Sequence, residues 1–130
     1  MSELVLIGNS NQLAKLIQQS FEKPLFLYKH STNCGSSRNA HVAIHHFIKK
    51  FPGLASQFSF AVVRVIEEKN ISDQITNDLG VPHMSPLLLL VYQGKVIWNA
   101  SHQMIHSNNL SASAQHFLKN IHHRSEKSES

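Results

Sequence analysis

Residues 24–38, PLFLYKHSTNCGSSR, hold the only cysteine of this 130-residue chain and its clearest change of pattern. The apolar run at 24–28 predicts a buried strand, and the polar residues after it predict a loop. From about Cys34 to Phe51, apolar residues recur with helical spacing, so a helix is expected directly after the loop. This order places Cys34 at a helix N-terminus, where unpaired backbone N–H groups and the helix dipole favour a thiolate.

Cys34 is accordingly predicted to be the catalytic residue of a redox site. The alternative, which stays open from the residues alone, is a small buried hydrophobe, the common fate of an isolated cysteine. The polar residues on both sides of Cys34 favour the reactive thiol. Ser37 stands where a Cys-x-x-Cys pair would place its second cysteine, so Cys34 would act by single-thiol exchange. Lys29 and Arg38 are expected to add positive charge near the sulfur.

Four neighbours of this cysteine are candidate site residues. Ser37 could donate a hydrogen bond to the thiolate, or it could be only a polar residue of the first helical turn. His30 could transfer protons or stabilise the thiolate, and an equally open role is a bond to a loop carbonyl. Gly35 would let a partner approach the backbone closely. Thr32, a candidate helix cap together with Asn33, is placed with Gly35 among the substrate-binding residues.

Elsewhere the patterns predict short strands and amphipathic helices. Ser10 and Asn70 are expected helix N-caps, Gly80 is expected to end a helix, and Gln93-Gly94 is expected to turn a hairpin. The expected elements are an edge strand at 4–7, helices from 10, at 34–51, at 70–79 and from about 109, strands at 25–29 and 60–66, and a hairpin at 87–100.

The predicted order of the main elements is α–β–α–β–α–β–β–α, with the cysteine after the first core strand and Pro86 directly before the hairpin. This is the arrangement of thioredoxin. The predicted fold class is therefore α/β with a thioredoxin fold: a four-stranded mixed sheet flanked by helices, with an extra N-terminal helix. Residues 1–122 are expected to form a single thioredoxin-like domain. The polar segment 123–130 lacks an apolar stripe and is expected to be disordered.

Composition narrows the classes of partner and location. The net charge is +4, but the basic residues are scattered, so nucleic acid is not an expected partner. No apolar run is long enough to cross a bilayer, so no membrane is expected either. The first residues lack the basic start and apolar core of a signal peptide. A lone cysteine fits a reducing compartment, and a cytoplasmic location is expected.

Residues from about Ser20 to His106 resemble the monothiol bacilliredoxin family of the bacillithiol system. The segments that carry the resemblance are YKHST at 28–32, the Cys-x-x-Ser site at 34–37, the Val-x-His-x-Ser-Pro loop at 81–86 and GKVIWNASH at 94–102.

The resemblance implies an oxidoreductase that removes bacillithiol, or a similar small thiol, from mixed disulfides on proteins. Cys34 would be the acceptor thiol, the small thiol would be a co-substrate, and no cofactor would stay bound. Ser85 would offer backbone hydrogen bonds to the docked partner, as the residue before this proline does in thioredoxin-like folds. Pro86 would follow a cis peptide bond.

Two other functions stay open. One is a thioredoxin-fold module that binds partners along the Pro86 edge without catalysis. The other is a metal carrier, because residues 34–37 are similar to the Cys-Gly-Phe-Ser of monothiol glutaredoxins, some of which hold an iron–sulfur cluster. His41 and His45, four residues apart on one helix, could also hold a metal, although a solvated helix face explains them as well. The expectation adopted is that no metal is bound.

Overall fold

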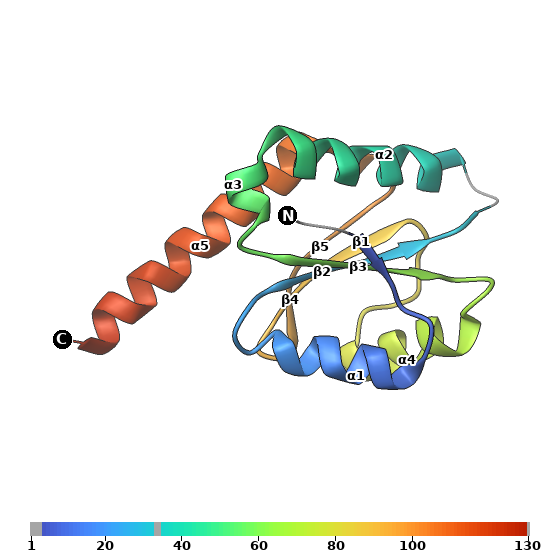
Figure 1. The fold of residues 1–130 in the computed structure, drawn as a ribbon, viewed down its shortest axis with the longest axis horizontal. Coiled ribbons are helices and arrows are strands. Elements are labelled where there is room, and N and C mark those ends of the chain that lie inside the picture. Colours follow the sequence, from blue (N-terminus) through green and yellow to red (C-terminus); the bar gives the residue numbers. More distant parts are fainter. Residues whose placement is uncertain (1–3, 33–34, 130) are drawn as a thin grey trace.

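The computed structural model describes residues 4–32 and 35–129, with side chains as far as Ile121. Asn33 and Cys34 lie outside the described residues. The elements, shown in Figure 1, are β1 (Leu4–Leu6), α1 (Ser10–Gln19), β2 (Leu25–His30), α2 (Gly35–Lys50), α3 (Pro52–Ala55), β3 (Ser59–Arg64), α4 (Lys69–Leu79), β4 (Leu87–Tyr92), β5 (Lys95–Ser101), the 3-10 turn η1 (His102–Met104) and α5 (Ser107–Glu129).

The sheet has five strands in the order β1-β3-β2-β4-β5, so the prediction of four strands is corrected. The extra strand is the edge strand expected at 4–7. It pairs parallel to β3, with Leu4 opposite Phe60 and Leu6 opposite Val62. This pairing satisfies backbone groups on the outer edge of β3 that would otherwise be unpaired. β2 runs parallel to β3, and the β4–β5 hairpin joins it antiparallel, which confirms the mixed sheet of the thioredoxin fold.

Helices cover both faces of the sheet. Figure 1 shows α1 and α4 on one side of the strands and α2, α3 and α5 on the other. The buried apolar side chains accordingly form two clusters, one on each face. β2 contributes to both because its side chains alternate: Phe26 and Tyr28 join the cluster under α2 and α5, and Leu25 and Leu27 join the cluster over α1 and α4. The central strands are therefore buried on both faces, as their apolar runs predict.

The residues at the N-cap positions of two helices differ from the predictions by one and two positions. The N-cap of α1 is Asn9, whose side chain accepts a 2.9 Å hydrogen bond from the Gln12 amide, so the prediction of Ser10 was wrong. Glu68, and not Asn70, is the residue before α4. The Glu68 carboxylate does not cap the helix, because it accepts hydrogen bonds from the backbone and guanidinium of Arg64.

The predicted turns are confirmed. Gly80 ends α4 in the left-handed region, at φ 72°. Gln93 and Gly94, at φ 53° and 75°, form the two-residue connection of the hairpin.

The last helix is longer than its apolar stripe. α5 extends to Glu129 and includes the polar segment expected to be disordered, and the division of the chain at residue 122 stays a prediction. Over the described residues, no helix is both long enough and apolar enough to cross a membrane.

Candidate active site

The candidate site forms where β2 ends. Lys29 lies opposite Leu87 in the antiparallel β2–β4 pair, so the Ser85-Pro86 segment that leads into β4 lies beside the end of β2. The first described range ends at Thr32, two residues after His30, and the second begins with α2 at Gly35. The predicted catalytic Cys34 belongs to this short connection, outside the described residues. The geometry on both of its flanks is described.

Tyr28 fixes the protonation pattern of His30. The Tyr28 hydroxyl is fully buried and lies 2.7 Å from the carbonyl oxygen of Ser37 and 2.8 Å from Nδ1 of His30. A carbonyl can only accept, so the single hydroxyl proton points to Ser37. The Tyr28 oxygen must then accept at Nδ1, and His30 carries its proton there. In the neutral imidazole this leaves Nε2 with the lone pair.

The surroundings of His30 favour its neutral form. Partial burial lowers its pKa, and the nearby carboxylate of Glu67 opposes this effect with a smaller raising influence. No hydrogen bond joins Nε2 of His30 to any other described residue. The pair of Tyr28 and His30 therefore offers one imidazole nitrogen that can take up a proton. Of the two roles left open for His30, the bond to a loop carbonyl is not seen among the described residues, where its partner is the Tyr28 hydroxyl.

Ser37 is buried in the first turn of α2 and ties this turn to the end of β2. Its Oγ accepts a 3.2 Å hydrogen bond from the Ser31 amide, and its carbonyl accepts from Tyr28. Since the amide supplies the proton of the first bond, the Ser37 hydroxyl proton has no acceptor among the described residues. A bond to the Cys34 thiolate, as the sequence suggests, stays a prediction.

Thr32 and Gly35 flank the cysteine on the surface. Both are exposed. The Thr32 hydroxyl lies 3.5 Å from Oε2 of Glu67, a weak contact. A side-chain atom built on Gly35 would meet nothing within 4 Å, so the space beside its backbone is open to a docking partner. Their substrate-binding roles stay predictions that this open geometry permits.

The Ser85–Pro86 peptide bond is cis, as expected. Pro86 is buried, and its carbonyl accepts a 3.3 Å hydrogen bond from the His102 amide. The Oγ atom of Ser85 is buried and has no hydrogen-bond partner among the described residues. A buried hydroxyl of this kind is costly unless a partner completes it, so the edge beside Pro86 has an unfilled polar position.

The expectation that Lys29 adds charge near Cys34 stays a prediction, because Cys34 lies outside the described residues. Strand alternation turns the fully buried Lys29 side chain to the other face of the sheet, under α4. There Nζ donates to Thr76 Oγ1 at 2.7 Å and lies 3.5 Å from Nδ1 of His83. Burial lowers the pKa of Lys29, and the charge of Asp73 opposes this more weakly. Lys29 thus connects β2 to the loop that precedes Pro86.

Two histidines on α2 stand close together. Nε2 of His41 lies 2.9 Å from Nε2 of His45, and the His41 ring packs 5.2 Å from the His30 ring. Burial lowers the pKa of His41, and His45 and His30 lower it further. Within the described part of the chain, no group of three or more His, Cys, Asp or Glu side chains is placed to hold a metal ion.

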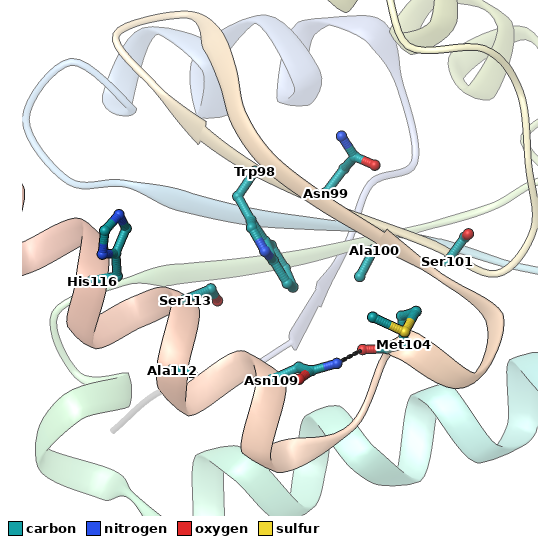
Figure 2. Close-up of a pocket in the computed structure, with 9 residues that line it drawn as sticks. All are labelled: Trp98, Asn99, Ala100, Ser101, Met104, Asn109, Ala112, Ser113 and His116. Carbon is teal, nitrogen blue, oxygen red and sulfur yellow. Dashed lines mark hydrogen bonds between the residues drawn. The ribbon is translucent and has the colours of Figure 1, made fainter.

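A groove of about 520 Å³ lies between β5 and α5, and Figure 2 shows its lining. Trp98 forms one wall, half-buried and edge-on to Phe26. Asn109 and Met104 close one end, where the Asn109 amide donates to the Met104 carbonyl at 2.8 Å. Ser101, also in the lining, pairs with Leu87, so this end of the groove reaches the strand that follows Pro86.

Comparison with known proteins identifies the family. The family described as "Monothiol bacilliredoxin BrxC" matches residues 6–110. A solved structure titled as a candidate oxidoreductase with a thioredoxin fold is 26% identical, covers 86% of this chain and 93% of its own, and superposes with a TM-score of 0.74.

Thioredoxins superpose as well. The one from Fasciola hepatica is 18% identical, with 87% of this chain and 98% of its own covered and a TM-score of 0.67. Thioredoxin NaTrxh from Nicotiana alata is 20% identical, with 86% and 90% covered and a TM-score of 0.66. These confirm the fold, and the match over residues 6–110 shows that the chain belongs to the monothiol bacilliredoxin family.

Proposed function

We propose that this chain is a single-thiol oxidoreductase that removes a small thiol, bacillithiol or a similar molecule, from mixed disulfides on proteins. Family membership and the thioredoxin fold support thiol–disulfide chemistry. The observation that carries the proposal furthest is the arrangement of Tyr28, His30 and Ser37. It leaves, among the described residues, an imidazole nitrogen and a hydroxyl proton without partners, on His30 before Cys34 and on Ser37 after it.

The first step activates the thiol. Nε2 of His30 takes the proton of Cys34, and the positive end of α2 together with the Ser37 hydroxyl stabilises the resulting thiolate. The imidazolium keeps its Nδ1 proton on the Tyr28 oxygen, so the ring does not need to reorient when it gains charge.

The second step exchanges one disulfide for another. The Cys34 thiolate attacks the sulfur of the small thiol in the mixed disulfide, forming a new S–S bond as the bond to the target cysteine breaks. The target sulfur leaves with the electron pair and receives the proton held by His30. A second molecule of small thiol, as its thiolate, then attacks the adduct, releasing a symmetrical small-molecule disulfide and the Cys34 thiolate. The second small thiol is the reductant, because the first is part of a disulfide both before and after the exchange.

The target protein would dock along the Ser85-Pro86 edge. The space beside Gly35 is open, and the backbone of Ser85, before the cis bond to Pro86, would offer hydrogen bonds to the docked segment. The expected targets are cytoplasmic proteins that carry mixed disulfides. The same edge also favours the second candidate, a module that binds such partners without exchanging disulfides.

Intact-mass analysis after incubation with bacillithiol disulfide, and separately with glutathione disulfide, tests the proposal. The wild-type chain should gain the mass of one small thiol, and Cys34→Ser should gain none. Ser36→Ala, an exposed neighbour, is the matched control and should react like the wild type. If no adduct forms with either disulfide, the proposed oxidoreductase function is wrong and the non-catalytic binding module is favoured. Adduct formation by Cys34→Ser would contradict the mechanism.

A further inference from the structure

A small pocket lies beside the candidate site, on the α2 side of the sheet. Its volume is about 230 Å³, and it is lined by His30, Ser31, Thr32, Arg38, His41 and Val42. The walls come from both flanks of Cys34: Thr32 is two residues before it and Arg38 four residues after it. The pocket is thus lined by residues that precede and follow Cys34 closely in the sequence.

The chemistry of the pocket is that of an anion site. Arg38 is exposed and makes no ion pair with any described residue, whereas Arg64 and Lys69 are both paired with carboxylates. Imidazoles and hydroxyls supply further hydrogen-bonding groups, and none of the lining residues carries a negative charge. The nearest carboxylate is Glu67, which lies 3.5 Å from the Thr32 hydroxyl and 4.0 Å from Arg64, so its charge is shared with another cation.

We propose that this pocket is the subsite for a carboxylate group of the small thiol, with Arg38 as its principal ligand. The inference rests on the proposed function and names a ligand subsite of the same site. A guanidinium presents parallel N–H groups that match a carboxylate, and Arg38 is the lining residue that can make this paired contact. Pockets that hold whole ligands usually exceed about 300 Å³, so this one is sized for part of a molecule.

The test compares two disulfides that differ in charge. Glutathione disulfide carries carboxylates, and 2-hydroxyethyl disulfide has none. Second-order rates of Cys34 adduct formation are measured with each, and the ratio of the two rates is compared between variants. Arg38→Gln should lower the ratio about tenfold, the size expected for the loss of one hydrogen bond to a charged group. Arg38→Lys, which keeps the positive charge but loses the parallel N–H groups of the guanidinium, should give an intermediate ratio.

A second variant separates a pocket from a general charge effect. Val42 lines the pocket and is 62% exposed, so Val42→Trp can fill the space without changing charge or core packing. It should lower the ratio by a similar factor. Lys95→Gln, which removes an exposed charge at the start of β5, is the matched control and should keep the wild-type ratio.

The remaining outcomes overturn one proposal or the other. If Arg38→Gln lowers the ratio and Val42→Trp does not, attraction at a distance explains the preference and the pocket is not the site. An unchanged ratio in both variants also overturns the pocket. A wild-type chain that reacts with neither disulfide contradicts the proposed function instead, so the two failures are distinguishable.

Discussion

The two faces of β2 end in different polar arrangements. On the face under α2, Tyr28 and His30 form a hydrogen-bonded pair whose outer nitrogen stays available for a proton. On the face under α4, Lys29 is fully buried and donates to the neutral side chain of Thr76. Tyr28, Lys29 and His30 are consecutive, so one strand end carries two polar arrangements. The first, Tyr28 with His30, can take up a proton. In the second, the buried Lys29 amine connects β2 to the loop that precedes Pro86.

We expect the Tyr28–His30 pair to act in thiol exchange and Lys29 to act in the stability of the fold. Substitutions at His30 and Tyr28 should change the rate and pH dependence of thiol exchange. His30 precedes Cys34 by four residues, and Tyr28 hydrogen-bonds both to His30 and to Ser37, three residues after Cys34. Substitution of Lys29 should change the stability of the fold and its response to pH, with little effect on the thiol. Each prediction below tests one side of this division.

His30→Ala should have the largest effect. Without the imidazole, the thiol should return toward its ordinary pKa of about 8.5, at which only about 3% is ionised at pH 7. The rate of alkylation by iodoacetamide should therefore fall by up to about 30-fold at pH 7, and it should recover by pH 9.5, where an ordinary thiol is also ionised. A rate that stays low at pH 9.5 would show damage to the loop and not the loss of a base.

Tyr28→Phe should have a smaller effect of the same kind. The ring stays in the core, but Nδ1 of His30 loses its acceptor, so both neutral tautomers become populated. A reduction of the alkylation rate at pH 7 of about fivefold is expected, with a shifted pH profile. Nitrogen NMR of the imidazole should report the Nδ1–H tautomer in the wild type and a mixture in the variant. A wild-type spectrum dominated by Nε2–H would contradict the assignment.

Alternating burial explains what the sequence could and could not predict here. The strand, the helix after Cys34 and the turn at Gln93-Gly94 follow from local patterns that the fold preserves. The role of Tyr28 was missed because it reads as one more apolar residue of a core strand. Its spacing of two from His30 was the available signal, since such residues share a face.

Partners distant in sequence were not predictable in the same way. Thr76 and His83 meet Lys29 only because α4 packs on that face of the sheet. The pocket at Arg38 likewise depends on how α2 packs over the end of β2, and a local sequence pattern does not determine the packing angle between them. The cap of α1 was missed by one residue, because Asn9 and Ser10 are both suitable cap residues and the Asn9 side chain accepts the Gln12 amide.

Lys29→Met should leave the alkylation rate within about twofold of the wild type, and it should change the pH dependence of stability. Because burial lowers the pKa of Lys29 in the folded state, the unfolded chain binds more protons between that lowered value and about 10.4. The wild-type free energy of unfolding should therefore gain a rising contribution as pH increases through this window. Urea unfolding at pH 8 and pH 10 should show this contribution in the wild type and lose it in Lys29→Met.

The smallest expected effect concerns His41, on the His30 side of the same sheet. Its pKa is also lowered, chiefly by burial, so its contribution has the same sign as that of Lys29 in a different pH window. The stability is fully present above the ordinary value of about 6.5 and is lost as pH falls through the lowered folded value.

His41→Gln should remove part of the acid sensitivity seen by urea unfolding between pH 7 and pH 5, by about 0.5 kcal/mol or less, as for a substitution near the surface. His46→Gln, an exposed histidine of the same helix, is the control and should keep the wild-type response. Equal responses in both variants would mean that His41 does not lose solvation on folding. In that case the ring contact between His41 and His30 would not couple their charges, and the α2 face would act through Tyr28 and His30 alone.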